Sequence, residues 1–242
     1  MPRQPRLDFQ DTTHHIFHRG DGKEPIFLDD ADRRFFLRRL RALQRELHFK
    51  LFAFCLMDNH FHLALKRAVV PLHKIMQRLL TAHARVFNDR WAKVGHTFQG
   101  RYGSRPVRSD ADLMGLVRYI HLNPVKAGIV TSPEAWPWSS HADVLAGRSD
   151  TIDVGLVRGL FDGVDNYLAF MKQPAPEIER PSLESLAGPH AERLKGAGRA
   201  EKCVELRREF VAEALRCGWK RSDVARYLGK TRGAITRLLQ RS

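Results

Sequence analysis

The sequence predicts an α+β domain followed by a small all-α domain. Strand-like and helix-like hydrophobic patterns alternate in the first half of the chain, in the order strand, helix, strand, strand, helix, strand, helix. This order fits a ferredoxin-like antiparallel sheet with its helices on one face. A later stretch rich in Pro, Gly, Ala and charge, residues 172–200, reads as a linker. The chain is therefore expected to divide into residues 1–171, the linker 172–200, and a C-terminal domain of residues 201–242.

The elements of the first domain follow from local patterns. The segment "HHIFH" has strand character, and the stretch after Asp29 repeats large apolar residues at helical spacing. The apolar run "LFAFCLM" and the segment "HFHLALK" flank Asp58 and Asn59, which favour turns, and so predict a β-hairpin. Ser109 is a suitable cap for the helix that follows it. Besides the hairpin, we expect a strand at 14–18, helices from 29, over 72–90 and from 110, and a short strand near 105.

The segment after these elements carries two tryptophans. Trp136 and Trp138 flank a proline, and either pack this segment onto the sheet or stack on bases. We favour packing. Residues 150–171 predict further helices that extend the same domain.

The charge balance indicates a polyanionic partner. Lys and Arg number 41 against 27 Asp and Glu, which gives a net charge of +14 and a pI near 10.3. Nucleic acid is the commonest partner of so basic a protein. No stretch is apolar enough to cross a membrane, and the N-terminus does not resemble a signal peptide. We expect a cytoplasmic, nucleoid-associated bacterial protein with no membrane partner.

The C-terminal segment is especially basic, with 14 Lys and Arg against 6 Asp and Glu in residues 191–242. Within it, Ala225, Gly229 and Ile235 have the spacing of a helix-turn-helix. Ala225 permits close helix packing, Gly229 supplies the turn and Ile235 anchors the second helix. The side chains expected to face a DNA duplex are Arg232, Thr236 and Arg237. The alternative is a basic helical hairpin that contacts another protein.

Two histidines stand out in the predicted hairpin. In a strand, alternate side chains share a face, so His60 and His62 point the same way. Two adjacent imidazoles can bind one metal ion, although hydrogen-bonded histidines are also common in sheets. A site with so few protein ligands leaves coordination positions open for a substrate oxygen. In a basic protein, a phosphate oxygen is the expected substrate atom.

A tyrosine on the third helix is the candidate nucleophile. Tyr119 and Asn123 share a face of this helix that differs from its buried stripe, which is formed by Leu113, Leu116, Val117 and Ile120. The amide oxygen of Asn123 is a suitable metal ligand, and a phenol can attack the same phosphate. Spacing alone favours a packed boundary tyrosine and a helix-terminating asparagine. Tyr102 is a competing nucleophile, but it precedes a Gly-Ser turn and does not lie on a helix.

Four motifs together carry a resemblance to a known family. "CLMDNHFHLAL", "HTFQGRYGSRPV", "VRYIHLNPVKAGIV" and "WPWSSH" occur in an order and at separations that resemble the REP-associated tyrosine transposases. These are relatives of the small single-tyrosine transposases in the HUH endonuclease superfamily. The resemblance covers residues 12–147. One departure is Asp58, where the family usually has Pro; a carboxylate here is expected at most to alter ion affinity.

The resemblance implies a catalytic mechanism. It assigns Mg²⁺ or Mn²⁺ to His60, His62 and Asn123, and makes Tyr119 the nucleophile on single-stranded DNA. The product is a 5′-phosphotyrosine, from which another 3′-hydroxyl can rejoin the strand without ATP. Relatives act on hairpins formed by repetitive extragenic palindromes. Duplex DNA is a further expected partner, through the C-terminal helix-turn-helix.

Basic residues near these motifs are expected to contact the DNA strand, with one aromatic ring for stacking. They are Arg19, Lys23, Arg101, Tyr102, Arg105 and Arg108. An alternative function is a non-catalytic regulator that grips DNA hairpins. A replication or conjugation nickase fits less well, because such proteins share the histidine pair but not the later motifs. The chain is expected to act as a monomer or a homodimer.

Overall fold

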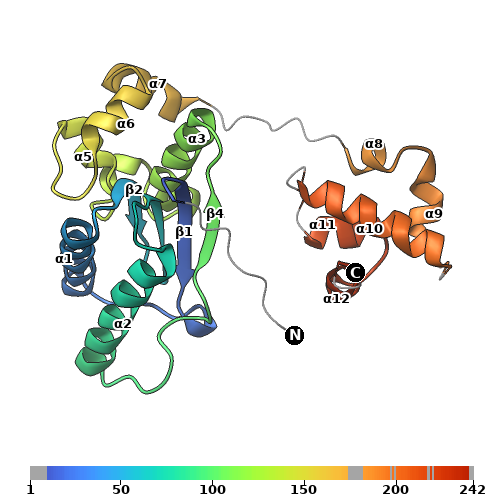
Figure 1. Cartoon of the computed structure of the whole chain (residues 1–242), viewed down its shortest axis with the longest axis horizontal. Coiled ribbons are helices and arrows are strands. Elements are labelled where there is room, and N and C mark those ends of the chain that lie inside the picture. The colour runs from blue at the N-terminus through green and yellow to red at the C-terminus, as the bar shows by residue number, and fades with distance from the viewer. Residues whose placement is uncertain are drawn as a thin grey trace. The chain divides into compact units, whose positions relative to one another are not determined.

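The chain folds into two compact units, residues 1–173 and 174–242, in a computed structural model (Figure 1). The structure describes residues 10–173, 182–196, 198, 200–216, 219 and 221–239. Among these residues, no helix has the length and apolar character needed to cross a lipid bilayer.

Unit 1 is built on a four-stranded antiparallel sheet. Its strands are β1 (Thr13–Arg19), β2 (Lys50–Leu56), β3 (His60–Lys66) and β4 (Gly103–Pro106), in the spatial order β2-β3-β1-β4. The two strands of the predicted hairpin, β2 and β3, are neighbours, and β1 is inserted between β3 and β4. This is the strand order of a ferredoxin-like sheet, so the predicted α+β class is confirmed.

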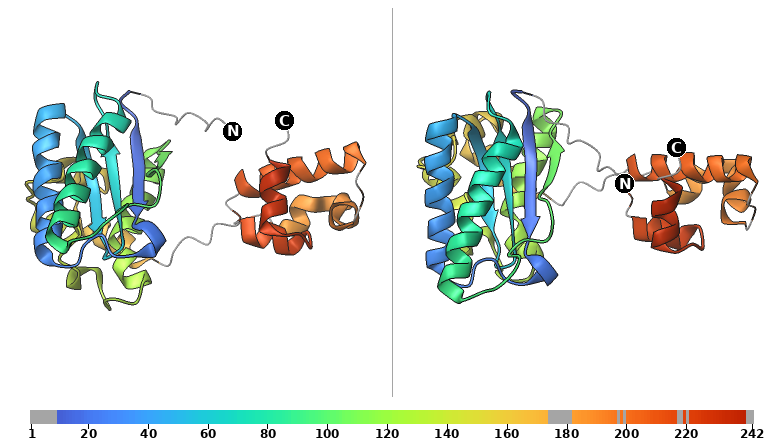
Figure 2. Two further views of the ribbon diagram at one scale, coloured as in Figure 1. Left: turned by 90° about the horizontal axis from the view of Figure 1, so that it is seen from below. Right: turned by 60° about the horizontal axis from the view of Figure 1, so that its bottom comes forward.

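Two long helices pack side by side on one face of the sheet (Figure 2). They are α1 (Asp30–Leu47) and α2 (Leu72–Trp91). Asp29 caps α1 by accepting a hydrogen bond from the Asp32 backbone N–H, as expected for a short polar residue at a helix start. The Phe36 ring of α1 contacts Phe61 of β3 and His83 of α2, with centroids 5.0 and 5.3 Å apart. This aromatic contact joins both helices to the sheet.

The third helix covers the opposite face, so the prediction of helices on one face holds for α1 and α2 only. Helix α3 (Asp110–His121) packs on β2 and β3, and begins behind the predicted Ser109 cap. Leu122 links it to the short helix α4 (Asn123–Lys126), which starts with Pro124 in its first turn. Proline lacks an amide hydrogen, so it is tolerated there and not further along a helix. The chain therefore continues helically one turn beyond α3.

The tryptophan segment extends the sheet along the free edge of β2. The backbone N–H of Leu56 donates to the carbonyl of Trp138, and that of Ser140 donates to Phe54, at 2.8 and 3.0 Å. The indole of Trp136 donates to the Leu56 carbonyl at 3.2 Å. The tryptophans thus pack on the sheet, as predicted. The remaining elements of unit 1 are η1 (Asp21–Lys23), η2 (Pro133–Ala135), α5 (His141–Ala146), α6 (Val154–Leu160) and α7 (Val164–Lys172).

Unit 2 is entirely helical in its described residues and has its own core. Leu183, Ala187 and Leu194 are buried in this core, although the composition predicts them to lie in a linker. The linker prediction over 172–200 is therefore wrong for residues 183–195, which form helices. The elements of unit 2 are α8 (Leu183–Ala187), η3 (Gly188–His190), α9 (Ala191–Lys195), α10 (Glu201–Arg216), α11 (Arg221–Tyr227) and α12 (Arg232–Leu238).

A buried arginine explains why this polar segment folds. The guanidinium of Arg207 on α10 donates to the carbonyls of Leu194, Gly196 and Gly198 at 2.9, 2.6 and 2.7 Å. These carbonyls lie at and beyond the end of α9, where a helix leaves its last acceptors unpaired. Arg207 is only 5% exposed. A residue that reads as surface charge in the sequence thus holds α9 against α10.

The predicted helix-turn-helix positions form two helices joined by a turn. Val224, Ala225, Leu228 and Ile235 are buried where α11 meets α12. Gly229, in the turn, has a φ of +60°, which favours glycine. Thr231 caps α12 by accepting a hydrogen bond from the Ala234 backbone N–H. The local geometry is that of a compact helical hairpin.

We expect Gly103→Ala to destabilise unit 1, because a Cβ at this position would lie 2.3 Å from the Phe17 ring on β1. Overpacking of this kind costs about 1–3 kcal/mol. Gly115→Ala on α3 is the matched control. A Cβ there meets no atom within 4 Å, so the helix should gain roughly 0.5–1 kcal/mol. Urea unfolding of the two variants should shift in opposite directions; equal shifts would contradict the contact.

Candidate active site

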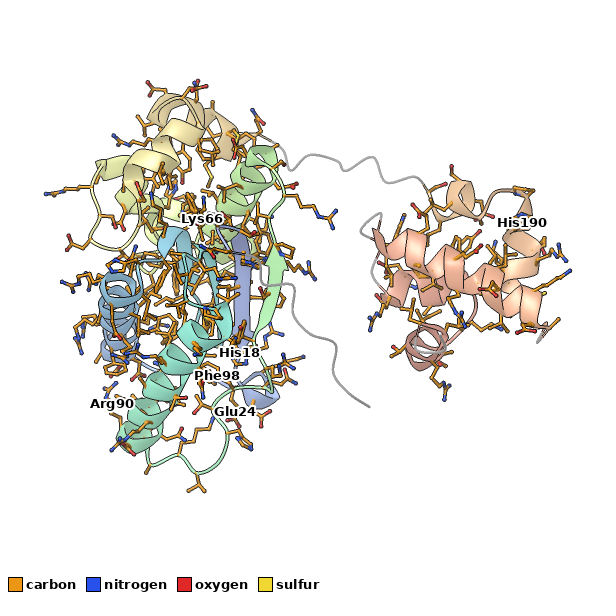
Figure 3. The ribbon with its side chains drawn as sticks, in the orientation of Figure 1. His18, Glu24, Lys66, Arg90, Phe98 and His190 are labelled. Atoms are coloured by element: carbon orange, nitrogen blue, oxygen red, sulfur yellow. The ribbon has the colours of Figure 1, made fainter. Side chains whose placement is uncertain are left out.

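Three histidines share the sheet face that α3 covers. In the pairing of β1 with β3, His60 lies opposite Arg19 and His62 opposite Phe17, so these side chains lie on one face. His15 lies on the same face, two residues from Phe17. We call His15, Phe17, Arg19, His60 and His62 the histidine face. His18 of β1 points to the other side of the sheet, where it stacks on Phe98 with centroids 4.5 Å apart (Figure 3).

Helix α3 brings the candidate nucleophile over the histidine face. The Tyr119 ring lies 5.3 Å from His62 and 5.6 Å from His15, measured between ring centroids. Tyr119 is 38% exposed. Asn123, one turn later, is nearly buried, and its Oδ1 lies 3.4 Å from Nε2 of His60. The four predicted residues therefore lie together, although they come from segments about sixty positions apart.

Hydrogen bonds fix the tautomer of His60. The amide nitrogen of Asn59 donates to the Lys23 carbonyl at 3.0 Å, which turns the Asn59 oxygen toward His60. Nδ1 of His60 donates to that oxygen at 2.7 Å. The lone pair of a neutral imidazole is then on Nε2, the atom that faces Asn123. Burial, the largest cause, lowers the pKa of His60, which favours this neutral form.

His62 is held in a similar way by His15. Nδ1 of His62 and Nε2 of His15 are 3.0 Å apart, so one nitrogen donates and the other accepts. Burial, followed by the charge of Arg105, lowers the pKa of His15 to about 4. Burial, followed by the neighbouring His15, lowers the pKa of His62 to about 3. Both imidazoles are therefore neutral near pH 7, which is the form that binds metals.

The donor set suits one divalent cation. Two unprotonated acceptors, Nε2 of His60 and Oδ1 of Asn123, face each other at 3.4 Å. Two ligands that each lie about 2.1 Å from one ion are separated by roughly 3.0–3.4 Å. A hydrogen bond to the other ring nitrogen, as His60 and His62 both have, is typical of histidines that bind metals. Within the described ranges, no group of three His, Cys, Asp or Glu side chains is placed to hold a metal.

The predicted DNA contacts lie in both units: five basic residues in unit 1, two of them beside the histidines, and three residues on α12 of unit 2. Arg19 and Arg105 lie near the histidines: Arg19 pairs with His60 across the strands, and Arg105 pairs with His15. The Arg105 guanidinium lies 5.6 Å from the Phe17 ring centroid, and Lys23 is exposed in η1. Arg101 and Arg108 are exposed before and after β4. In unit 2, Arg237 is exposed on α12 and Thr236 is half-buried, while the Arg232 side chain lies outside the described part.

Tyr102 does not offer a ring for stacking. It is 8% exposed and packs in the core of unit 1, so its predicted stacking role is wrong. Burial also removes it from competition with Tyr119 as the nucleophile. The segment "GRYGS" predicts an exposed turn because of its glycines and serine, whereas the Tyr102 side chain is buried.

Asp58 forms an ion pair with an arginine of α1 and does not belong to the histidine face. Its carboxylate forms an ion pair with Arg33 of α1, which is buried. The guanidinium of Arg33 also lies 5.7 Å from the Phe27 and Trp138 ring centroids. The carboxylate therefore ties the hairpin turn to α1.

Four further residues of the site were not predicted from the sequence: His15, Phe17, Asn59 and Lys126. His15 and Phe17 follow from the period-two pattern of "HHIFHR", which sets them on the face of Arg19. Lys126 of α4 places its ammonium 5.2 Å from the Tyr119 ring centroid. Its position seven residues after Tyr119, two helical turns, is the signal that could have identified it.

Comparison with known proteins confirms the resemblance. The family described as "Transposase IS200 like" matches residues 9–123. A REP-associated tyrosine transposase of Haemophilus influenzae is 32% identical over 110 residues, which span 40% of this chain and 62% of that relative. The matched part of the relative is thus less than two thirds of its length.

A solved structure has the same fold. It is a REP-associated tyrosine transposase bound to a REP hairpin, and it superposes with a TM-score of 0.52 at 17% identity. The superposition covers 64% of this chain and 90% of the other.

We expect the unfolding free energy to fall as the pH is lowered below about 6.5. The unfolded chain protonates His15 and His62 near their ordinary pKa, whereas the folded chain, with values of about 4 and 3, does not. Between the folded-state pKa and about 6.5, each of these histidines lowers the free energy of unfolding by about 1.4 kcal/mol for every unit that the pH falls. Urea unfolding with EDTA, at about pH 7 and about pH 5, measures this loss, and His15→Gln should reduce it. The exposed His73→Gln is the control; an equal reduction there would contradict the assignment.

Proposed function

Because residues 9–123 match the family described as "Transposase IS200 like" and part of the chain is similar to a REP-associated tyrosine transposase, we propose that this chain is a metal-dependent single-stranded DNA endonuclease and strand transferase. Its substrate is hairpin-forming repetitive palindromic DNA, and Tyr119 forms a 5′-phosphotyrosine intermediate. The observation that carries the proposal is the placement of Tyr119 and Asn123 over His60 and His62.

The reaction is a pair of transesterifications. The Tyr119 hydroxyl attacks a backbone phosphorus and releases its proton, the bond from phosphorus to the 3′-oxygen breaks, and that oxygen leaves as a 3′-hydroxyl. A 3′-hydroxyl of the same or another strand then attacks the phosphotyrosine, and Tyr119 leaves. One phosphodiester bond is lost and one is formed, so no ATP is needed.

The neighbouring side chains have distinct tasks. His60, His62 and Asn123 would hold Mg²⁺ or Mn²⁺, which supplies positive charge beside the non-bridging phosphate oxygens. Lys126 adds positive charge beside the phenol, and this charge stabilises the phenolate when Tyr119 leaves. Three basic side chains would contact the phosphates of the strand. They are Arg19 on the histidine face, Arg105 opposite His15, and the exposed Lys23, whose carbonyl accepts from Asn59.

The hairpin is the proposed partner for two reasons. A solved structure with the same fold is described as bound to a REP hairpin, and the basic surroundings of the histidine face suit a phosphate backbone. In unit 2, we propose that α12 reads duplex DNA with Arg232, Thr236 and Arg237 while α11 supports it.

We expect Tyr119→Phe to abolish the covalent product. The purified chain is incubated with labelled hairpin DNA and Mn²⁺ and run on a denaturing gel, where a phosphotyrosine adduct survives SDS. Tyr102→Phe is the control and should retain the adduct, because Tyr102 is buried in the core. EDTA should remove it. Tight hairpin binding by the wild type without any adduct would instead support a non-catalytic regulator.

We expect Arg237→Ala to weaken binding to duplex DNA. The plot of the logarithm of the association constant against the logarithm of the salt concentration should also become less steep by about 1. Arg226→Ala on α11 is the matched control, since its side chain is 82% exposed and lies on the other helix of the pair. Fluorescence anisotropy at several salt concentrations measures both slopes. Equal losses in the two variants would argue for a general charge effect and against reading by α12.

A further inference from the structure

A chain of hydrogen bonds lies behind α3, on the side away from Tyr119. His121 comes two residues after Tyr119 and two before Asn123, and its side chain is fully buried. Its Nδ1 lies 2.8 Å from the Tyr167 hydroxyl of α7, and its Nε2 lies 2.7 Å from the Ser140 hydroxyl. Both ring nitrogens of His121 are therefore engaged.

The chain continues from Tyr167 to the protein surface. The Tyr167 hydroxyl also bonds Nδ1 of His141, and Nε2 of His141 lies 3.1 Å from the carboxylate of Glu134. Tyr167 and His141 are buried, whereas the Glu134 side chain is 51% exposed. The other end is tied to the sheet, because the backbone N–H of Phe54 on β2 donates to the Ser140 hydroxyl at 2.9 Å.

The proton positions in this chain follow from one carboxylate. The ring of His121 contacts two hydroxyl groups, and the ring of His141 contacts one hydroxyl and the Glu134 carboxylate, so a neutral form of each ring, with a single N–H, satisfies all of these partners. An ionised Glu134 can only accept, so Nε2 of His141 donates and Nδ1 accepts from the Tyr167 hydroxyl. The Tyr167 oxygen then accepts from Nδ1 of His121. Nε2 of His121 accepts from the Ser140 hydroxyl at 2.7 Å, which is a shorter contact than the 3.4 Å from that hydroxyl to the Phe54 carbonyl. Every bond in the chain thus runs in one direction, from Ser140 to Glu134.

We propose that Glu134, His141 and Tyr167 are positioning residues, which set the tautomer of His121 and thereby hold α3 in place over the histidine face. The proposal rests on the proposed function, because its consequence is the alignment of Tyr119 and Asn123 with His60 and His62. Helix α3 has its apolar residues packed on the sheet, but apolar contacts permit small rotations and shifts. Directed hydrogen bonds between His121 and Tyr167 of α7, and between His121 and Ser140, which is itself bonded to β2, remove that freedom.

The chain also couples α3 to the C-terminal part of unit 1. Glu134, Ser140, His141 and Tyr167 all come from residues 134–167, beyond the matched transposase segment of residues 9–123. The helical extension thus does more than cover the sheet. A displacement of about 1 Å at a reacting group can cost roughly 100-fold in rate, so the alignment of α3 has a direct chemical consequence.

The test is Tyr167→Phe in the full chain. This change removes one hydroxyl from the centre of the chain and leaves the ring packing. The rate of covalent adduct formation at saturating hairpin DNA should fall by at least about tenfold, while the Kd for the hairpin stays within about twofold of wild type. Ile75→Val, in the α2 core on the other side of the sheet, is the control for lost stability. An adduct rate in Tyr167→Phe as high as in this control, per folded molecule, would overturn the proposal.

Glu134 provides a second test through the histidine tautomers. Nitrogen-15 NMR of the imidazoles should show the proton on Nε2 of His141 and on Nδ1 of His121. Glu134→Gln keeps an oxygen acceptor and should retain both tautomers and the rate, whereas Glu134→Ala should lose the unique tautomer of His121 and slow the adduct. The opposite tautomers in the wild type would overturn the proposal. The tautomers are read without DNA, so a wild type without any adduct would refute the proposed function and leave the hydrogen-bond chain separately testable.

Discussion

The pairing register of β1 against β3 is the constraint on which the candidate site depends. A shift of one residue would turn every side chain of a strand to the other face of the sheet. Ile16, Phe61 and Leu63 are fully buried under α1 and α2, so apolar burial enforces the observed register. The same register sends His60 and His62 to the face under α3. The energy that stabilises the core therefore also places the imidazoles.

Helix α3 serves the core and the site at once. Val117 and Ile120 are buried with the sheet, while Tyr119 stays partly exposed above the histidines. His121, on another side of the same helix, is polar and completely buried. Buried polar groups are costly unless each finds a partner, and the partners here come from α7 and the β2 edge. The helix is thus specified by apolar packing on one side and by directed hydrogen bonds on another.

The second unit shows how a polar sequence can be structural. Pro, Gly and charge over residues 172–200 suggest a linker, yet Leu183 and Leu194 bury against α10. Arg207 supplies the missing hydrogen bonds where α9 ends. Burial of an arginine is tolerated because its guanidinium meets several carbonyls at once. Such a role is invisible in a count of charges, which treats every arginine as surface.

The sequence by itself determined the order of strands and helices, the shared face of His60 and His62, and the helical spacing of Tyr119 and Asn123, because these follow from periods of two and 3.6 residues. Tertiary structure alone decided that α3 crosses the face opposite α1 and α2, that His15 supports His62, that Tyr102 is buried, and that His121 joins Tyr167. Local periodicity states which side chains share a face. It cannot state which distant segment covers that face, because this depends on packing between elements far apart in the chain.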